Sequence, residues 1–312
     1  MPPALIDAPN LPARDRLTPE DIVREVKQLP SAPKVLPRLK QLLGDGNSSM
    51  IEIVAYIRLD PGIAARVLRM ANSAYFSKGV RCVTVDEAVN RVGYNSVYEL
   101  VSYAVASQVL VRPLAAYGVE ADELWLMSVA CALAAEALAE RTGQDCSIAY
   151  TIGLLHCVGM VAIDEWALRH ARGLVLRRSG FPREAVESER AVLGFSQAET
   201  GEALLQHWEF PSNITDPVRW QYAPRASSHE VRMSCLLHAA KWLRSAVCAA
   251  PGAPRPPLPD ASQLLALGME PEKLAKMTDL VAGRLATVSS LLDAPEPAAP
   301  DRTAFPAQSW RG

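Results

Sequence analysis

The chain has 312 residues, of which 49% are hydrophobic and 21% are charged. This composition is typical of a globular protein with a sizeable core and excludes a mainly disordered chain. A formal net charge of −2 gives the molecule no overall field that would attract nucleic acid or an acidic membrane surface, so we expect neither as a partner.

Both ends of the chain are predicted to be disordered tails. Residues 1–17 are rich in proline and carry charges at Arg14, Asp15 and Arg16, so they lack the continuous apolar run of a signal peptide. Residues 294–312 form a second tail, rich in proline and alanine. The folded part of the chain is therefore expected between these two tails.

Signals for helix starts follow one another from residue 18 onward. Four of them resemble capping boxes, in which a polar N-cap residue is followed three positions later by an acidic one. The four pairs are Thr18 with Asp21, Ser49 with Glu52, Thr84 with Glu87, and Ser196 with Glu199. Pro19 and Pro61 fit the first helical position, where the amide has no partner in any case. Each signal precedes apolar residues at helical spacing.

Glycines indicate where several of these helices end. Gly44, Gly93 and Gly143 are predicted stops. A break at Gly159 separates a helix over 145–156 from one that continues to about Arg178. The other helices are expected over 18–28, within 29–44, and over 50–59, 61–71, 85–92, 95–110, 122–142, 182–193 and 197–208, with a further one starting at 211. Since no segment alternates with the two-residue period of a strand, we predict an all-α fold.

Residues 223–293 are predicted to form a C-terminal helical extension. A boundary falls at Ala223–Ser228, which contains Pro224 and two serines. Helices are expected over 229–249, 261–267 and 271–292, with an extended proline-rich connection over 251–260. The extension either packs onto the preceding helices or forms a small lobe of its own.

One segment, Cys146–Ile163, contains no Asp, Glu, Lys or Arg. A membrane-spanning helix needs about 20 mainly apolar residues, whereas this run is shorter and contains Gly153, His156 and Gly159. We interpret it as buried core helices. None of the six cysteines forms a CxxC pair, so we expect reduced, buried thiols in a cytoplasmic protein.

Several segments resemble the signature of the HDOD domain family. They are LPSAP at Leu29–Pro33, LDPGIAARVLRMANSAYFS at Leu59–Ser77, TVDEAVNRVGYNSVYELV at Thr84–Val101, and GLLHCVGM at Gly153–Met160. HDOD domains are all-helical relatives of the HD metal-dependent phosphohydrolases and occur as bacterial signalling modules. The resemblance implies an HD-like multi-helix bundle over 18–222, about two thirds of the chain, followed by the extension.

The resemblance also implies that the metal site of the HD enzymes has been lost. Those enzymes hold metal through histidines and aspartates, and the metal generates hydroxide near neutral pH. Of their adjacent His-Asp pair, His156 remains, but Cys157 replaces the aspartate. At the positions of other ligand histidines stand Met127, Gln197 and the pair Gln221–Tyr222. We expect His156 to be a structural histidine, and we expect no metal, cofactor or catalytic residue at this vestigial site.

These observations predict a non-catalytic, cytoplasmic regulatory module. It is expected to contact signalling proteins of a second-messenger or two-component pathway directly, and self-association into a homo-oligomer is left open. Two alternatives remain. One is a divergent HD-type nucleotide phosphohydrolase or phosphodiesterase, whose ligands would lie elsewhere. The other is a nucleotide sensor that uses a vestigial cavity around Met127, His156 and Gln197.

Other polar residues are better explained without a functional role. Five arginines between 169 and 183 could bind a phosphate, but such a group more often forms the solvated face of a helix. His229 and His238 are nine residues apart, which is wrong for a shared metal on one helix face. Asn72 and Ser73 are expected to form hydrogen bonds between core helices.

Overall fold

The computed structural model describes most of the chain between residues 17 and 293. The described residues are 17–26, 35, 39, 42, 48–73, 76, 79–106, 113–176, 183–249 and 256–293. Residues 1–16 of the first predicted tail, the whole second tail and the Leu29–Pro33 segment lie outside them, whereas Leu17 packs against the core. The helices are α1 (Pro19–Val23), α3 (Met50–Arg58), α4 (Pro61–Asn72), α5 (Val85–Ala106), α6 (Ala121–Thr142), α7 (Cys146–Leu155), α8 (Val158–His170), α9 (Arg183–Leu193), α10 (Gln197–His207), α11 (Ser212–Arg219), η1 (Pro224–Ala226), α12 (Val231–Val247), α13 (Ala261–Leu267) and α14 (Pro271–Asp293). The only β-structure in these ranges is an isolated bridge between Leu114 and Val119, so the all-α prediction is confirmed.

The predicted helix starts are present, with one variation in hydrogen bonding. Complete capping boxes form at Thr18 and Ser49, and the Glu199 carboxylate accepts a hydrogen bond from the backbone N–H of Ser196 at 2.7 Å. At the start of α5, Thr84 Oγ1 accepts from the Glu87 N–H at 3.2 Å. The Glu87 carboxylate accepts from the Val83 N–H instead of the cap. Local hydrogen bonding therefore fixes these helix starts, as the sequence predicts.

Two predicted helix ends are wrong. The helix expected over 18–28 ends at Val23, because the next amides bond three residues back, with Val26 N–H donating to the Val23 carbonyl. This tighter turn buries the Val26 side chain. The helix expected to reach Arg178 ends at His170, where the chain turns toward a backbone hydrogen bond between Leu176 N–H and the Ala116 carbonyl.

Gly159 does not break a helix, contrary to the prediction. The break falls at His156 and Cys157, and Gly159 lies inside α8. A Cβ atom at Gly159 would lie only 1.9 Å from the Gln197 carbonyl oxygen on α10. Gly153 has a similar role on α7, since its Cβ would lie 2.7 Å from the Ala132 Cα on α6. Both glycines allow two helix backbones to approach closely, which is a tertiary role.

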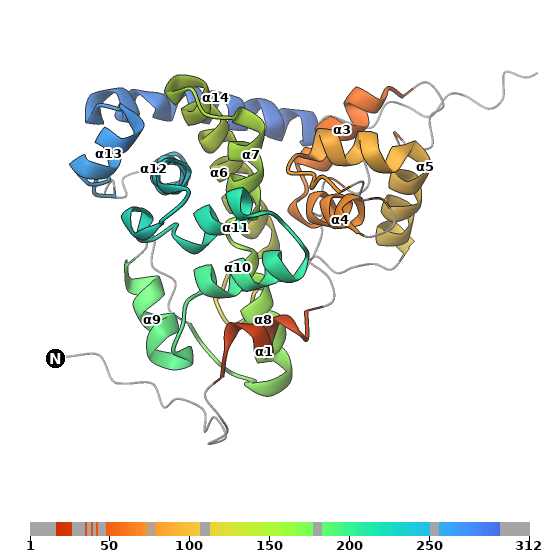
Figure 1. Cartoon of the computed structure of the whole chain (residues 1–312), viewed down its shortest axis with the longest axis horizontal. Coiled ribbons are helices and arrows are strands. Elements are labelled where there is room, and N and C mark those ends of the chain that lie inside the picture. The colour runs from red at the N-terminus through yellow and green to blue at the C-terminus, as the bar shows by residue number, and fades with distance from the viewer. Residues whose placement is uncertain are drawn as a thin grey trace, which may run out of the picture.

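Figure 1 shows α6 and α7 side by side at the centre of the molecule. α10 packs against α8 and α11, while α1 covers α8 and α10. α12 packs against α6, α7 and α11, and α14 packs against α6 and α12. The C-terminal extension therefore packs onto the preceding helices, which decides between the two arrangements that the sequence left open.

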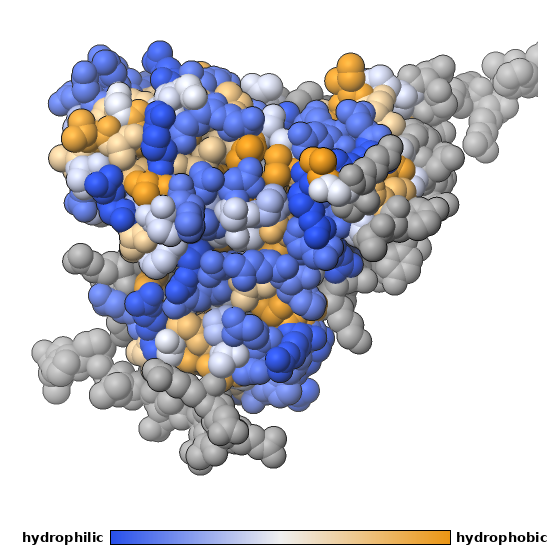
Figure 2. All heavy atoms as spheres, in the orientation of Figure 1, coloured by the Kyte–Doolittle hydropathy of each residue, from blue (hydrophilic) through white to orange (hydrophobic). Residues whose placement is uncertain are grey.

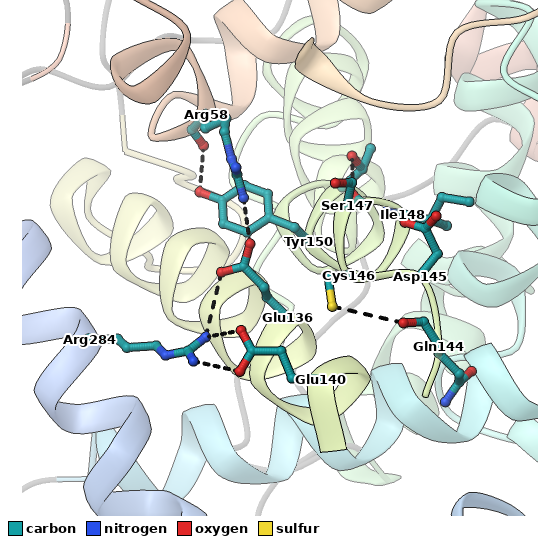
Figure 3. Close-up of polar contacts among 11 residues, drawn as sticks. Arg58, Glu136, Glu140, Gln144, Asp145, Cys146, Ser147, Ile148, Tyr150 and Arg284 are labelled. Atoms are coloured by element: carbon teal, nitrogen blue, oxygen red, sulfur yellow. Dashed lines mark hydrogen bonds and ion pairs between the residues drawn. The ribbon is translucent and has the colours of Figure 1, made fainter. Parts of the chain in front are cut away.

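The cluster of α3, α4 and α5 joins the central helices through a polar group (Figure 3). Arg58 of α3 places Nη2 2.6 Å from Glu136 Oε1 on α6, and its guanidinium lies 4.3 Å from the ring centroid of Tyr150 on α7. The Tyr150 hydroxyl donates to the Arg58 carbonyl at 2.8 Å. On the other side, Arg284 of α14 donates to both carboxylate oxygens of Glu140, at 3.0 and 2.7 Å. Helices from both ends of the chain are thus anchored to one stretch of α6.

Asn72 holds α4 to the segment that leads into α5. It is 1% exposed, its Nδ2 donates to the Cys82 carbonyl at 3.0 Å, and its Oδ1 accepts from the Cys82 N–H at 2.7 Å. Asn72 is thus buried and hydrogen-bonded, but its partner lies before α5 and not on another helix. Ser73 Oγ donates to the Met70 carbonyl of α4, so the expected bond between helices is wrong for Ser73. Because Asn72→Ala leaves two buried backbone groups without partners, we expect it to lower the free energy of unfolding by about 2–4 kcal/mol. Urea unfolding measures this loss; Ser73→Ala is the neighbouring control, and equal effects of both would contradict the prediction.

The apolar segment noted in the sequence lies in α7 and α8. Cys146–His170 is long and apolar enough to span a membrane by length and composition alone, but 83% of its apolar window is buried inside the protein. Such burial is typical of core helices. Among the cysteines, Cys82, Cys131, Cys157 and Cys235 are buried, Cys146 is partly buried and Cys248 is exposed, so the expectation of burial is wrong for Cys248.

Candidate functional site

His156 lies between α7 and α8, at the centre of the molecule, and is 1% exposed. Its Nδ1 is 2.7 Å from the Gly153 carbonyl oxygen. Because a carbonyl only accepts hydrogen bonds, we assign the proton of the neutral ring to Nδ1, which leaves a lone pair on Nε2. Burial, together with the positive charges of Arg244 and Lys241, holds the pKa of His156 well below its usual value. The imidazole is therefore neutral.

Arg244 of α12 occupies the side of His156 where a metal would bind. Its Nη1 lies 3.3 Å from His156 Nε2, so the guanidinium donates to the remaining imidazole lone pair. Arg244 also donates from Nη2 to Ser245 Oγ at 3.3 Å and is only partly buried. A residue of the C-terminal extension therefore occupies the ring nitrogen of His156 that could otherwise bind a ligand.

Lys241 lies one turn before Arg244 on the same helix and is 4% exposed. Its Nζ donates to Gln221 Oε1 at 2.6 Å and lies 3.4 Å from the ring centroid of Tyr222. Burial is the main reason that the pKa of Lys241 falls well below its usual value, and the positive charge of Arg244 adds to the shift. A second cationic side chain therefore reaches the same group.

Gln221 joins Lys241 to the backbone of His156. Its Nε2 donates to the carbonyl oxygens of His156 and Val218, both at 2.9 Å. His238 of α12 places Nδ1 2.9 Å from the Gln221 carbonyl. The side chain that stands in place of a ligand histidine thus forms hydrogen bonds on both of its ends, and its oxygen accepts from Lys241.

Gln197 begins α10 and is 1% exposed. Its Nε2 donates to the Tyr222 hydroxyl at 2.7 Å, while its Oε1 is buried and has no hydrogen-bond partner. The backbone N–H of Gln197 donates to Glu189 Oε2 at 2.8 Å, and the Tyr117 hydroxyl donates to Glu189 Oε1 at 3.0 Å. Burial raises the pKa of Glu189 to about 7, against the effect of these two hydrogen bonds.

Cys157 does not take over the ligand role of an aspartate. Its Sγ lies 3.1 Å from Ser128 Oγ on α6. Burial raises the pKa of the thiol, which disfavours the thiolate form that binds metals. Met127, the neighbour of Ser128, is partly buried and packs against the core. The structure thus links His156, Cys157, Gln197 and Gln221 through polar contacts with Ser128, Tyr222, Lys241 and Arg244, whereas Met127 contributes apolar packing.

This set of side chains does not fit the metal ion of an HD enzyme. The lone pair of His156 Nε2 accepts a hydrogen bond from Arg244. The positive charge of Lys241 acts on the same imidazole. Within the described part of the chain, no group of three His, Cys, Asp or Glu side chains is arranged to hold a metal. The positive charges of Lys241 and Arg244 repel a divalent ion. The amides of Gln197 and Gln221 are weaker ligands for a transition-metal ion than imidazole, carboxylate or thiolate.

The sequence interpretation missed Lys241 and Arg244, the two charged residues of this group. Both lie in the C-terminal extension, outside the segments that resemble HDOD domains. A signal was nevertheless present: His238, Lys241 and Arg244 are spaced by three along a helix whose other residues over 233–243 are mostly apolar. Such spacing places the three side chains on one face, and a charged residue on a buried face usually has a polar partner inside the protein.

The other candidates remain apart from this group. Arg169 forms ion pairs with Glu165 and Glu25 at the surface, while Arg177 and Arg178 lie outside the described residues. His207 and His229 are exposed. Trp208 is buried, as expected, and stacks beneath the guanidinium of Arg69, 5.5 Å from its ring centroid.

Comparisons with known proteins agree on the fold. An uncharacterized protein of Treponema pallidum (strain Nichols) is 28% identical over 207 residues, which make up 64% of this chain and 39% of that protein. This chain thus spans about two fifths of that relative's length. Among solved structures, the MmoQ response regulator from Methylococcus capsulatus str. Bath has 21% identity and a TM-score of 0.62, covering 80% of this chain and 98% of its own.

A virulence factor from Campylobacter jejuni subsp. jejuni has 16% identity and a TM-score of 0.63, covering 86% of this chain and all of its own. At these identities, the likeness to either structure establishes the fold alone. The model of the HDOD domain family matches residues 29–224, a range that contains α3 to α11 and every residue of the vestigial site. Because this match covers more than half of the chain, the protein belongs to the HDOD domain family.

Proposed function

We propose that this HDOD protein is a non-catalytic regulatory module that works in the cytoplasm by direct contact with other signalling proteins. The observation that carries the proposal is the contact between Arg244 and His156. Hydrolysis of a phosphate ester by an HD enzyme requires a metal-bound hydroxide. In this protein, both ring nitrogens of His156 form hydrogen bonds to protein groups, to the Gly153 carbonyl and to Arg244. A role in binding therefore fits the contacts of this histidine better than hydrolysis does.

Two further observations support a signalling role. MmoQ, which shares the fold, is named a response regulator, and for this chain we propose a place in a second-messenger or two-component pathway. In addition, the C-terminal part of the chain exposes three leucines, Leu258, Leu265 and Leu280, which are 45%, 80% and 43% exposed. Figure 2 shows an apolar area over α13 within a mainly hydrophilic face. Apolar surface of this kind favours contact with another protein.

Metal content and hydrolysis together test the non-catalytic part of the proposal. The full chain is purified without a tag, incubated with manganese, iron or zinc, and freed of unbound metal. We expect elemental mass spectrometry to find well below one equivalent, and we expect no hydrolysis of bis-p-nitrophenyl phosphate. His156→Ala should change neither result. One or two equivalents of metal that disappear in His156→Ala, with hydrolysis that disappears as well, would establish an enzyme and overturn the proposal.

A further inference from the structure

Two cationic side chains of α12 meet beside His156 without an acidic partner. Lys241 Nζ contacts Gln221 Oε1 and the Tyr222 ring, and Arg244 contacts His156 Nε2 and Ser245 Oγ. Among the described residues, no carboxylate forms an ion pair with either cation. Buried cations are usually paired with an anion, because the loss of hydration is costly. The positive charge of Arg244, and that of Lys241 when it is protonated, thus has no anionic partner among these contacts.

The nearest acidic group does not supply the missing charge. Glu189 acts on Lys241 through space, but its two oxygens accept hydrogen bonds from Tyr117 and from the Gln197 backbone. Burial also raises the pKa of Glu189 to about 7, so part of the population carries no charge at neutral pH. A separate anion would therefore interact favourably with Lys241 and Arg244.

A second observation that points to a ligand concerns Gln197, which contacts the same Tyr222 side chain as Lys241. Gln197 Oε1 is buried and has no partner, although Gln197 is joined to Lys241 through Tyr222. A buried acceptor of this kind needs a donor, and a protonated phosphate oxygen is one. The group also reaches solvent, because Tyr222 and Arg244 are partly exposed while His156, Gln197 and Lys241 are buried.

We propose that Lys241 and Arg244, with the Gln197 amide, bind the phosphate oxyanion of a small ligand. Arginine and lysine are the side chains that recognise phosphate, through charge-assisted hydrogen bonds. In this arrangement, protein cations supply the positive charge that a metal supplies in the HD enzymes, and no water is activated, so the ligand is bound without being cleaved. The inference goes beyond the proposed signalling role and does not depend on it.

Calorimetric titration of the full chain in a buffer that contains a metal chelator tests this site. The probes are inorganic phosphate, pyrophosphate and ADP, compared in the wild type, Arg244→Gln and Lys241→Gln. Arg232→Gln is the matched control, because Arg232 is an exposed arginine on the same helix that donates to the Thr142 carbonyl. We expect at least one probe to bind the wild type. Arg244→Gln should weaken the affinity for that probe by about tenfold or more, because a charge-assisted hydrogen bond is lost. Arg232→Gln should leave the affinity unchanged.

The results distinguish a free oxyanion from a nucleotide as the ligand, and they also test whether the site exists. Tighter binding of pyrophosphate than ADP indicates a free oxyanion as ligand, and the reverse order indicates a nucleotide; both support the proposal. If Lys241→Gln does not fold, the result rests on Arg244→Gln and on the shift of the His156 ring resonances in the wild type on adding the probe. The proposal is overturned if no probe binds the wild type, if binding persists in Arg244→Gln, or if Arg232→Gln weakens it equally.

Discussion

Replacing Gly159 with alanine is expected to lower the free energy of unfolding by about 3 kcal/mol, the upper range for overpacking a core. The added Cβ would lie 1.9 Å from the Gln197 carbonyl oxygen and 2.7 Å from the Gly201 backbone nitrogen. Both atoms belong to the backbone of α10, so no side chain can rotate to make room. α8 and α10 must separate, and the apolar contacts between them are lost.

Gly283→Ala is the matched control for this prediction. Gly283 also lies inside a helix, α14, but a Cβ there would have no heavy atom within 4 Å. Since alanine has the higher helix propensity, this change should raise the free energy of unfolding by about 1 kcal/mol. Urea unfolding of the wild type and both variants measures the two effects. Equal stability of Gly159→Ala and the wild type would mean that α8 and α10 are not packed as described.

The close approach of Gly159 to Gln197 also affects the candidate site. Gln197 is the first residue of α10, and α8 begins directly after His156 and Cys157. Separation of the two helices therefore moves Gln197 relative to His156. A Gly159→Ala protein that remains folded should bind the phosphate probes more weakly than the wild type, whereas Gly283→Ala should bind them equally.

The contribution of Glu189 to stability is expected to fall between about pH 4.5 and pH 7. Its pKa rises from 4.5 to about 7 on folding, with burial as the main cause. The folded protein therefore holds this proton more tightly than the unfolded chain. The contribution is complete below pH 4.5 and is lost as the pH rises through 7, and the total corresponds to about 3 kcal/mol. Glu189→Gln has no such proton, so the difference in stability between variant and wild type should rise by this amount over the same range.

Other groups also titrate in this pH range. The comparison of Glu189→Gln with the wild type therefore needs a second Glu→Gln variant on the same helix as a control. The pKa values of His156 and His238 fall on folding, mainly through burial, which gives the opposite slope in both wild type and variant. Glu187 is exposed on α9, two residues before Glu189. Glu187→Gln makes the same chemical change at an exposed position and is the control with which the Glu189→Gln profile is compared. Parallel pH profiles for Glu189→Gln and the wild type would show that Glu189 is not held protonated by the fold.

Local features of this sequence determined the helical framework. Thr18, Ser49 and Asp60 lie at helix starts because a side-chain oxygen satisfies an amide only three residues away. Gly143 ends α6 with a φ of 67°, which glycine adopts at little cost. Such interactions involve residues close together in the sequence, so these helix starts and ends can be predicted without the tertiary structure. The expectation that Cys157 stands where HD enzymes have an aspartate also came from the sequence, since Cys157 lies within the segment Gly153–Met160.

Only the tertiary structure decided what surrounds His156. Lys241 and Arg244 follow it by more than 80 residues and reach it because α12 packs against α6, α7 and α11. The role of Gly159 was misread for the same reason: its close neighbour, Gln197, lies on another helix. The spacing of residues along a chain determines which face of a helix they share, but the packing of apolar faces determines which helices meet. Here that packing brings the charges of the extension to His156.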